Sequence, residues 1–252
     1  TPNFAALEVN CPTLSGYNLF ADTTEPRKNA LGGIHYDLIT PLFTDYAAKY
    51  RYIFVPEGKQ GGYSNREVMD LPVGSIVAKT FTMPNDFLNP AAGEVIIETR
   101  LLLHRADGWV ALPYVWNADG TEATLKRAGQ RMDVSWTHLD GQTRTISYAV
   151  PNANQCKGCH VSGAAMTPIG PKVRNLDDGH QLQALAQAGL LSGKTQAVRP
   201  MPVWDKPESG TVALRARAYL DANCGHCHNK AGPADTSGLW LDWDQPADTN
   251  LG

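Results

Sequence analysis

The spacing of hydrophobic and polar positions divides the chain into two regions. Between residues 50 and 150, short runs rich in Val, Ile, Thr and aromatic residues, several of them alternating in polarity, predict β-strands. These runs cover residues 50–55, 74–81, 94–104, 109–116, 131–137 and 143–150. Asp-Gly pairs, which favour tight hairpin turns, separate several of them at Asp107-Gly108, Asp119-Gly120 and Asp140-Gly141. We therefore expect an antiparallel all-β domain, sandwich-like, over residues 1–150.

After residue 150 the apolar residues take helical spacing, and the connecting segments become rich in Gly and Pro. One helix, capped by Asp178 and closed by Gly193, would place several leucines on one face. A second helix, over residues 211–223, has apolar residues at positions i, i+4, i+7 and i+8 and runs directly into Cys224. We expect an α-helical region here, divided into residues 151–208 and 209–252.

The most informative residues of this region form a motif that occurs twice, Cys-x-x-Cys-His. It is the attachment signature of c-type haem. Two thiols three residues apart lie on one side of a helical turn and can add to the haem vinyl groups, and the histidine then reaches the iron as an axial ligand. The six residues are Cys156, Cys159 and His160, and Cys224, Cys227 and His228. They predict two covalently bound haem c groups, and His226, inside the second motif, receives no role.

A four-cysteine zinc site is the alternative interpretation of the same thiols. Zinc does not require a histidine directly after each second cysteine, whereas c-type haem does, so the sequence favours haem. A disulfide within either motif would close a very tight loop. A thioredoxin-like redox pair would need a βαβ setting, which neither motif has.

The two motifs differ in the chain that precedes them. A helix that delivers its C-terminal end to Cys224 is typical of small c-type domains. Cys156 instead follows a predicted strand and the polar loop 151–155, with no helix ahead of it. We therefore expect the first haem at the seam between the β-rich region and the helical region.

The second axial ligand of each iron decides whether the haem carries electrons or supports catalysis. For the first haem we predict Met201, which lies 41 residues after His160 between two prolines, as in small c-type domains. The alternative is that Met201 is a core thioether. His180 is the rival ligand and would make this site bis-histidine.

The second haem has no evident distal ligand, because no Met, His or Cys follows His228 in this sequence. Three explanations stay open. The native chain continues past Gly252, a histidine of the β-rich region reaches the iron, or the position is open. The histidines concerned are His35, His104 and His138, which are otherwise ordinary core or surface residues. We favour continuation, because a haem covered on one side only would expose its apolar macrocycle to water.

Composition limits the class of protein. A chain of 252 residues with 42% hydrophobic and 19% charged residues is ordinary for a globular protein. The net charge of −3 and the lack of a basic run argue against nucleic acid, and no apolar run is long enough to span a membrane. Because Thr1-Pro2 begins without a signal-type segment, we take the sequence as a processed form. Cys11, the odd cysteine, either pairs outside this sequence or is a buried free thiol.

Four segments together resemble a family of bacterial exported di-haem c-type cytochromes of uncharacterised function. They are residues 40–51, 112–117, 151–160 and 218–229, and the haem motifs are the most specific part. The resemblance spans nearly the whole chain. It implies a periplasmic or otherwise exported protein, electron transfer, and a possible partner with parallel β-helix repeats, since members are often encoded beside such a protein. The family also implies a later Met-containing segment, which this sequence does not have.

Three functions remain to be distinguished. The favoured one is a periplasmic electron carrier that exchanges electrons with other redox proteins. The second is a peroxidase-like di-haem oxidoreductase with one open iron, which carbon monoxide would bind in the ferrous state. The third is a binding module in which the β-rich domain recognises a partner and the haems are accessory.

Overall fold

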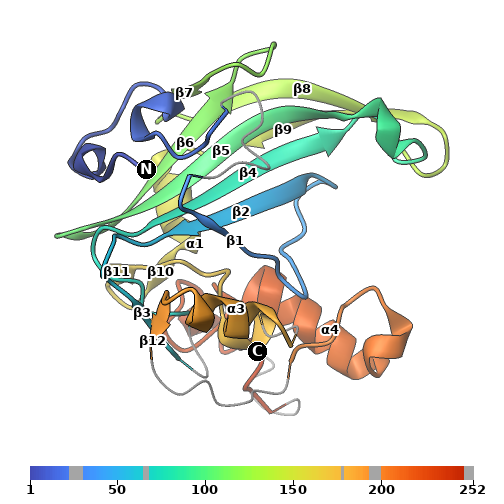
Figure 1. Cartoon of the computed structure of the whole chain (residues 1–252). Coiled ribbons are helices and arrows are strands. Elements are labelled where there is room, and N and C mark those ends of the chain that lie inside the picture. The colour runs from blue at the N-terminus through green and yellow to red at the C-terminus, as the bar shows by residue number, and fades with distance from the viewer. Residues whose placement is uncertain (23–30, 65–67, 177–178, 193–199, 247–252) are drawn as a thin grey trace. The chain divides into compact units, whose positions relative to one another are not determined.

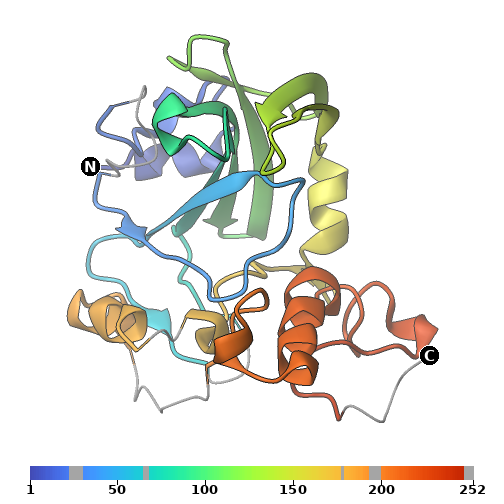
Figure 2. The ribbon, with the colours of Figure 1, turned by 90° about the vertical axis from the view of Figure 1, so that its right-hand side faces the viewer.

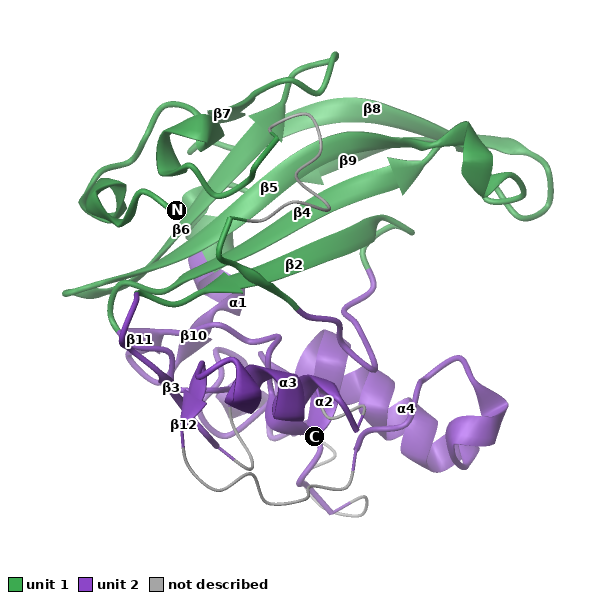
Figure 3. Ribbon diagram, in the orientation of Figure 1, with its two compact units in different colours: residues 1–35, 44–56, 73–156 green, residues 36–43, 57–72, 157–252 purple. Residues whose placement is uncertain are grey.

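The computed structural model describes residues 1–22, 31–64, 68–176, 179–192 and 200–246. In them the protein is mostly β, with an antiparallel sheet and a few short helices (Figures 1 and 2). The chain forms two compact units (Figure 3). Unit 1 comprises residues 1–35, 44–56 and 73–156, and unit 2 comprises residues 36–43, 57–72 and 157–252.

A six-stranded antiparallel sheet forms the centre of unit 1, in the order β1-β2-β4-β5-β6-β7. Its strands are β1 (Ile34–His35), β2 (Ala48–Phe54), β4 (Ile76–Pro84), β5 (Glu94–Arg105), β6 (Gly108–Trp116) and β7 (Ala123–Leu125). A separate hairpin consists of β8 (Gln130–Thr137) and β9 (Thr143–Val150), and a short turn, η3 (Pro90–Ala92), precedes β5. Every connection in this sheet joins neighbouring strands, and the tight turn between β5 and β6 carries the Asp107-Gly108 hairpin signal.

The six strands that the sequence predicts are confirmed as β2, β4, β5, β6, β8 and β9, each within a few residues of its expected ends. Two of the Asp-Gly pairs lie at the tight hairpins. Gly108 has φ 119° and Gly141 has φ 75°, values that glycine adopts readily because it has no Cβ. The sequence did not predict β1 and β7, which are too short to show a period.

One face of the sheet packs against the N-terminal segment, which forms η1 (Phe4–Glu8) and η2 (Leu14–Tyr17). Tyr17 and Tyr114 are both fully buried there, with their rings edge to face at 6.0 Å. Each large side chain that is buried in this way stabilises the fold by about 1.5–3 kcal/mol. The N-terminal segment is therefore part of the core.

The opposite face of the sheet packs against the β8–β9 hairpin and forms a second core. Its members are Phe81, Met83, Ile97 and Val115 of the sheet, Val134, Trp136, Tyr148 and Val150 of the hairpin, and Ala47. Apolar layers thus cover both faces of the sheet, and β9 ends beside this core just ahead of the first Cys-x-x-Cys-His motif.

Gly129, directly before β8, gives a testable prediction about this hairpin. Its φ is 75°, and a Cβ there would lie 2.6 Å from the Val150 carbonyl oxygen. Gly141 has the same φ, but a Cβ there would meet nothing within 4 Å. We expect Gly129→Ala to destabilise the protein by about 1–3 kcal/mol more than Gly141→Ala, because only the first adds a clash to the backbone strain. Urea unfolding of both variants measures the difference, and equal losses would contradict it.

Unit 2 contains short elements joined by long loops. Two short β-pairs are present, antiparallel β10–β11 and parallel β3–β12. The strands are β3 (Gly61–Gly62), β10 (Val161–Ser162), β11 (Ala165–Met166) and β12 (Leu191–Ser192), and the helices and turns are α2 (Val173–Leu176), α3 (Gln181–Gln187), η4 (Pro207–Ser209), α4 (Val212–Leu220), η5 (Asp221–Gly225) and η6 (Asp235–Ser237). Helix α1 (Ala153–Cys159) begins in unit 1 and ends in unit 2.

The helix expected over residues 211–223 is confirmed as α4 and the π-helical turn η5. The Thr211 hydroxyl caps α4 by accepting from the Leu214 amide at 3.3 Å. The other expected helix is shorter, because α3 covers only Gln181–Gln187, and its expected caps Asp178 and Gly193 lie outside the described residues. Among the described helices, none combines the length and apolarity needed to cross a bilayer.

The two units divide the chain differently from the ranges expected from the sequence, 1–150, 151–208 and 209–252. Unit 1 ends at residue 156, and segments 36–43 and 57–72, expected in the β-rich domain, belong to unit 2. Hydrogen bonds hold the first of them: Thr40 and Asn175 exchange two bonds at 2.8 and 2.9 Å. The Gly61 amide donates to the Leu190 carbonyl at 2.8 Å and holds the second. The sequence of a short segment does not reveal hydrogen-bond partners that lie more than a hundred residues away.

Candidate functional site

The first motif lies on α1, and the polar loop expected over residues 151–155 is wrong, because the helix already begins at Ala153. The Asn152 amide donates to the Gln155 side chain at 2.9 Å, and the Gln155 amide donates to the Asn152 side chain at 2.8 Å. This reciprocal pair is a capping box, with Asn in the place of Ser or Thr. It starts the helix immediately after β9, so no longer preceding helix is needed to deliver Cys156.

The histidine of the first motif is held by the loop that follows it. His160 Nδ1 lies 2.9 Å from the Thr167 carbonyl oxygen, and the Thr167 amide donates to the His160 carbonyl at 2.7 Å. The short β10–β11 hairpin makes this return possible. Because a carbonyl oxygen only accepts, Nδ1 must carry the hydrogen, and the lone pair of the ring lies on Nε2.

The second motif begins in η5, at the end of α4. The amides of Cys227 and His228 both donate to the Cys224 carbonyl, at 3.0 and 2.9 Å, so the motif forms a compact turn. A π-helical turn of this kind is uncommon and often marks functional sites. It changes the direction in which the side chains after α4 project.

His228 repeats the arrangement of His160. Its Nδ1 lies 3.3 Å from the Leu239 carbonyl oxygen, and the Leu241 amide donates to the His228 carbonyl at 2.8 Å. The Ser237 hydroxyl lies at 3.4 Å from the same ring nitrogen. In both motifs a carbonyl of a following loop therefore fixes the tautomer with Nε2 as the basic nitrogen, the arrangement usual for histidines that bind a metal.

The two motifs meet within unit 2. The ligand atoms of Cys159, His226 and Cys227 all lie within 4.8 Å of one another, and the Gly163 amide donates to the Ala231 carbonyl at 2.8 Å. Burial, together with the neighbouring Cys159, raises the pKa of the Cys227 thiol. His226 receives no role from the sequence analysis, and only its place in the fold brings it to this cluster. Among the described residues, the cluster includes neither Cys156 nor Cys224, so the four-cysteine grouping of the zinc interpretation is not found here.

A buried ion-pair cluster anchors the start of the second motif. Asp221, 3% exposed, accepts from Arg174 Nη2 at 3.0 Å, from Lys172 Nζ at 3.4 Å and from the Trp243 amide at 2.9 Å. Burial alone would raise the pKa of Asp221, but the charges of Lys172 and Arg174 and the bond from Trp243 hold it below its usual value. Asp221 thereby connects η5 to α2 and to the loop after His228.

The chemistry of the donors fits haem at both motifs: each offers two thiols three residues apart on a helical turn and a histidine whose Nε2 carries the lone pair. A further observation concerns the second motif. Trp240 Nε1, next to Leu239, and Arg217 Nη1 are buried donors that find no acceptor among the described residues. Such groups are rare in proteins and indicate that an acceptor is missing from the structure.

Met201, the expected distal ligand of the first haem, is 2% exposed, and its amide donates to the Arg174 carbonyl at 3.0 Å. It is deep in unit 2, as either a ligand or a core thioether would be, and its ligand role stays a prediction. His180, the rival, is exposed at the start of α3.

The remaining candidates belong to unit 1, where each is packed against its neighbours. His35 lies against Tyr52, His104 stacks on Trp109 at 4.4 Å, and His138 accepts from Trp136 Nε1 at 3.2 Å. Cys11 is half-buried against the first core, and none of the five cysteines, each among the described residues, forms a disulfide. These contacts suit ordinary structural roles.

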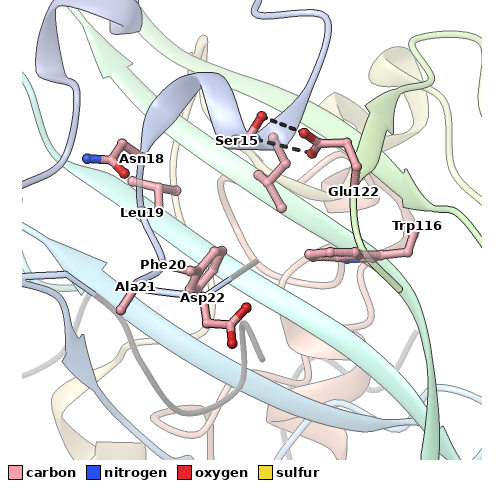
Figure 4. Close-up of a pocket in the computed structure, with 9 residues that line it drawn as sticks. Ser15, Asn18, Leu19, Phe20, Ala21, Asp22, Trp116 and Glu122 are labelled. Atoms are coloured by element: carbon pink, nitrogen blue, oxygen red, sulfur yellow. Dashed lines mark hydrogen bonds between the residues drawn. The ribbon is translucent and has the colours of Figure 1, made fainter. Parts of the chain in front are cut away.

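A pocket of about 270 Å³ lies in unit 1, and its lining contains no residue of either motif (Figure 4). None of its nine lining residues is Cys or His. Two carboxylates, Asp22 and Glu122, belong to the lining, and Glu122 accepts from the Ser15 hydroxyl and amide, as Figure 4 shows. We assign this pocket no chemistry.

Comparisons with known protein families, with curated proteins and with solved structures find no match to this chain, so the site must be interpreted from its own residues.

Proposed function

We propose that the protein is an exported, periplasmic di-haem c-type cytochrome that transfers electrons between redox partners. The observation that carries this proposal is the arrangement shared by His160 and His228. Each follows a Cys-x-x-Cys pair, and each donates through Nδ1 to a carbonyl of the loop that follows. A zinc site with these histidines as bystanders gives no reason for the same arrangement twice.

The residues of each motif have separate tasks. The thiols of Cys156 and Cys159, and of Cys224 and Cys227, would each add S–H across a vinyl double bond, sulfur to one carbon and hydrogen to the other, with no oxidant required. His160 and His228 would offer Nε2 as the proximal ligand, and Met201 would be the distal ligand at the first site. When bound, haem supplies a one-electron couple between ferric and ferrous iron. On this view the segments around α1 and α4 are two c-type attachment regions.

Electron transfer is favoured over catalysis by the adjacency of the motifs. Cys159 and Cys227, the second thiol of each pair, lie within 4.8 Å of one another. Two cofactors attached at neighbouring thiols are well placed to exchange electrons. The partners would be other redox proteins, with the β-helix repeat protein suggested by the resemblance as a further candidate.

A second candidate function rests on the same cluster. Cys159, His226 and Cys227 offer two sulfurs and one imidazole nitrogen, three of the four ligands of a structural zinc site. Zinc binding would need these thiols unmodified, so it and haem attachment exclude each other at Cys159 and Cys227.

One spectrum distinguishes these functions. We expect the dithionite-reduced protein, produced in cells that can attach haem, to show c-type absorption bands and two haems per chain. Carbon monoxide should leave these bands unchanged. A shift with carbon monoxide would mean an open iron and would direct attention to enzymatic turnover. No Soret band, with one equivalent of zinc by elemental analysis, would overturn the haem proposal in favour of the zinc site.

A further inference from the structure

Two thiols that belong to different motifs lie together in unit 2. The sulfur atoms of Cys159 and Cys227 and a ring nitrogen of His226 all lie within 4.8 Å of one another. Cys159 is exposed and Cys227 is half-buried, and neither forms a disulfide in this structure. The two thiols are therefore close to each other, and one of them is open to reagents in solution.

Hydrogen bonds within unit 2 hold the backbone next to each thiol. The Gly163 amide donates to the Ala231 carbonyl at 2.8 Å, which joins the segment that follows Cys159 to the segment that follows Cys227. The Cys227 carbonyl accepts from the Ala234 amide at 3.1 Å. Groups that a fold keeps side by side react with each other intramolecularly, at an effective concentration set by the fold and not by the amount of protein. The fold thus favours a reaction between these two thiols.

The distance between the two sulfurs suits a disulfide. A disulfide bond is about 2.05 Å long and needs Cβ atoms about 3.5–4.5 Å apart. Each sulfur moves by rotation about one bond, Cα–Cβ, so sulfurs that start within 4.8 Å of each other can reach bonding distance with little change of the backbone. The first thiols of the two motifs, Cys156 and Cys224, do not belong to this three-atom cluster.

We propose that Cys159 and Cys227 form a reversible disulfide between the two motifs in the chain that has not yet received haem. The bond would close residues 159–227 into one loop. The reaction partner is a disulfide, the class of oxidant that acts on exported proteins in oxidising compartments. The bond itself is inferred from the positions of the two sulfurs. Its consequence for haem rests on the proposed function.

The reaction consists of two exchanges that balance. The exposed Cys159 sulfur attacks one sulfur of the oxidant, so that a mixed disulfide forms and one thiol leaves. The Cys227 sulfur then attacks the Cys159 sulfur, the bond to the oxidant breaks, and a second thiol leaves. Two electrons pass from the two cysteines to the oxidant, and the two protons leave with the released thiols.

The bond would take one thiol from each motif. Attachment of haem through two thioethers needs both thiols of a motif, so a single bond between Cys159 and Cys227 would stop complete attachment at both motifs at once. A disulfide inside one motif would affect that motif alone. The two attachments would therefore be coupled, because both would begin only after a dithiol has reduced the same bond.

The test uses the full chain produced without haem, in the presence of a chelator that keeps metal ions from the thiols. The chain is treated with oxidised glutathione, its remaining thiols are blocked with iodoacetamide, and it is digested with trypsin, which cuts after Lys and Arg. Cys159 then lies in peptide 158–172 and Cys227 in peptide 218–230. We expect mass spectrometry to find these two peptides joined, and to find them separate after treatment with dithiothreitol.

Matched variants identify the thiols that are joined. Cys227→Ala should abolish the joined peptides, whereas Cys224→Ala and Cys11→Ala should retain them, since neither cysteine belongs to the cluster. Oxidation of the wild-type chain in a denaturing concentration of urea should lower the yield severalfold, because unfolding separates the thiols. The proposal is overturned if the yield in urea equals that of the folded chain or if all thiols stay free. It is also overturned if peptide 158–172 is joined to peptide 145–157, which carries Cys156, instead.

A chain produced in cells that attach haem tests the proposed function separately. If that chain carries two haems and the haem-free chain forms no bond between the two peptides, the proposed function stands and the disulfide is overturned. If the bond forms and no haem is attached, the disulfide stands without its consequence for haem, and the proposed function fails.

Discussion

Replacing Cys156 and Cys159 together by alanine is expected to remove one of two haems and to halve the c-type absorbance per chain. The same result is expected for Cys224→Ala with Cys227→Ala, and the four-fold variant should have no Soret band. The physical reason is that, if the proposed function holds, each pair would be the only thioether link to its own haem. Quantitative haem analysis of the purified proteins, alongside intact mass, measures the effect.

Cys11→Ala is the matched control. Cys11 is also a free thiol, but it lies in unit 1 against the first core and belongs to neither motif. Its replacement should leave two haems per chain. A variant of either motif that kept two haems, or a loss of both haems from one double substitution with the fold intact, would show that the motifs do not act as independent attachment sites.

Asp221→Asn is expected to destabilise the protein by about 3–5 kcal/mol, because it removes the buried carboxylate that pairs with both Lys172 and Arg174. The asparagine would keep the shape and could still accept from the Trp243 amide. Urea unfolding followed by tryptophan fluorescence measures the loss. Asp244→Asn is the control: Asp244 also approaches Arg174, at 3.7 Å, but is exposed, so its effect should stay within about 1 kcal/mol.

The same carboxylate gives a pH dependence whose sign follows from its lowered pKa. In the unfolded chain the pKa of aspartate is about 3.9, so the stabilisation by Asp221 is fully present above that value and is lost as the pH falls through the lower pKa of the folded state. We expect the wild type to lose stability in this acidic range and Asp221→Asn to lose less. Parallel curves for the two proteins would mean that Asp221 does not carry the ion-pair cluster.

The strands could be predicted because each is made by its own residues and closed by a local turn. Residues 94–104 and 109–116 show β-type composition on either side of Asp107-Gly108, and this is enough to place β5 and β6. The helix before Cys224 could also be predicted from neighbouring residues alone. By contrast, the start of α1 was missed, although Asn152 and Gln155 have the three-residue spacing of a capping box. The sequence holds that signal, but the polar residues 151–155 also suit a loop, which is what the sequence analysis predicts.

The candidate site could be predicted only as far as its motifs. The six Cys and His residues follow from their spacing, but the loops that hold His160 and His228 do not. That the two motifs meet at Cys159 and Cys227, and that His226 joins them, depends on contacts between segments some 70 residues apart, for which a single sequence holds no local signal.

The division of the chain between its units has a consequence for synthesis on the ribosome. Segments 36–43 and 57–72 emerge early, but their partners, such as Asn175 and Leu190, emerge more than a hundred residues later. Unit 1 can close once residue 156 has emerged, while these two segments wait as tethered loops. A fragment that starts at residue 151 would therefore keep both Cys-x-x-Cys-His motifs and yet lack two segments of unit 2, so it should not be expected to fold by itself.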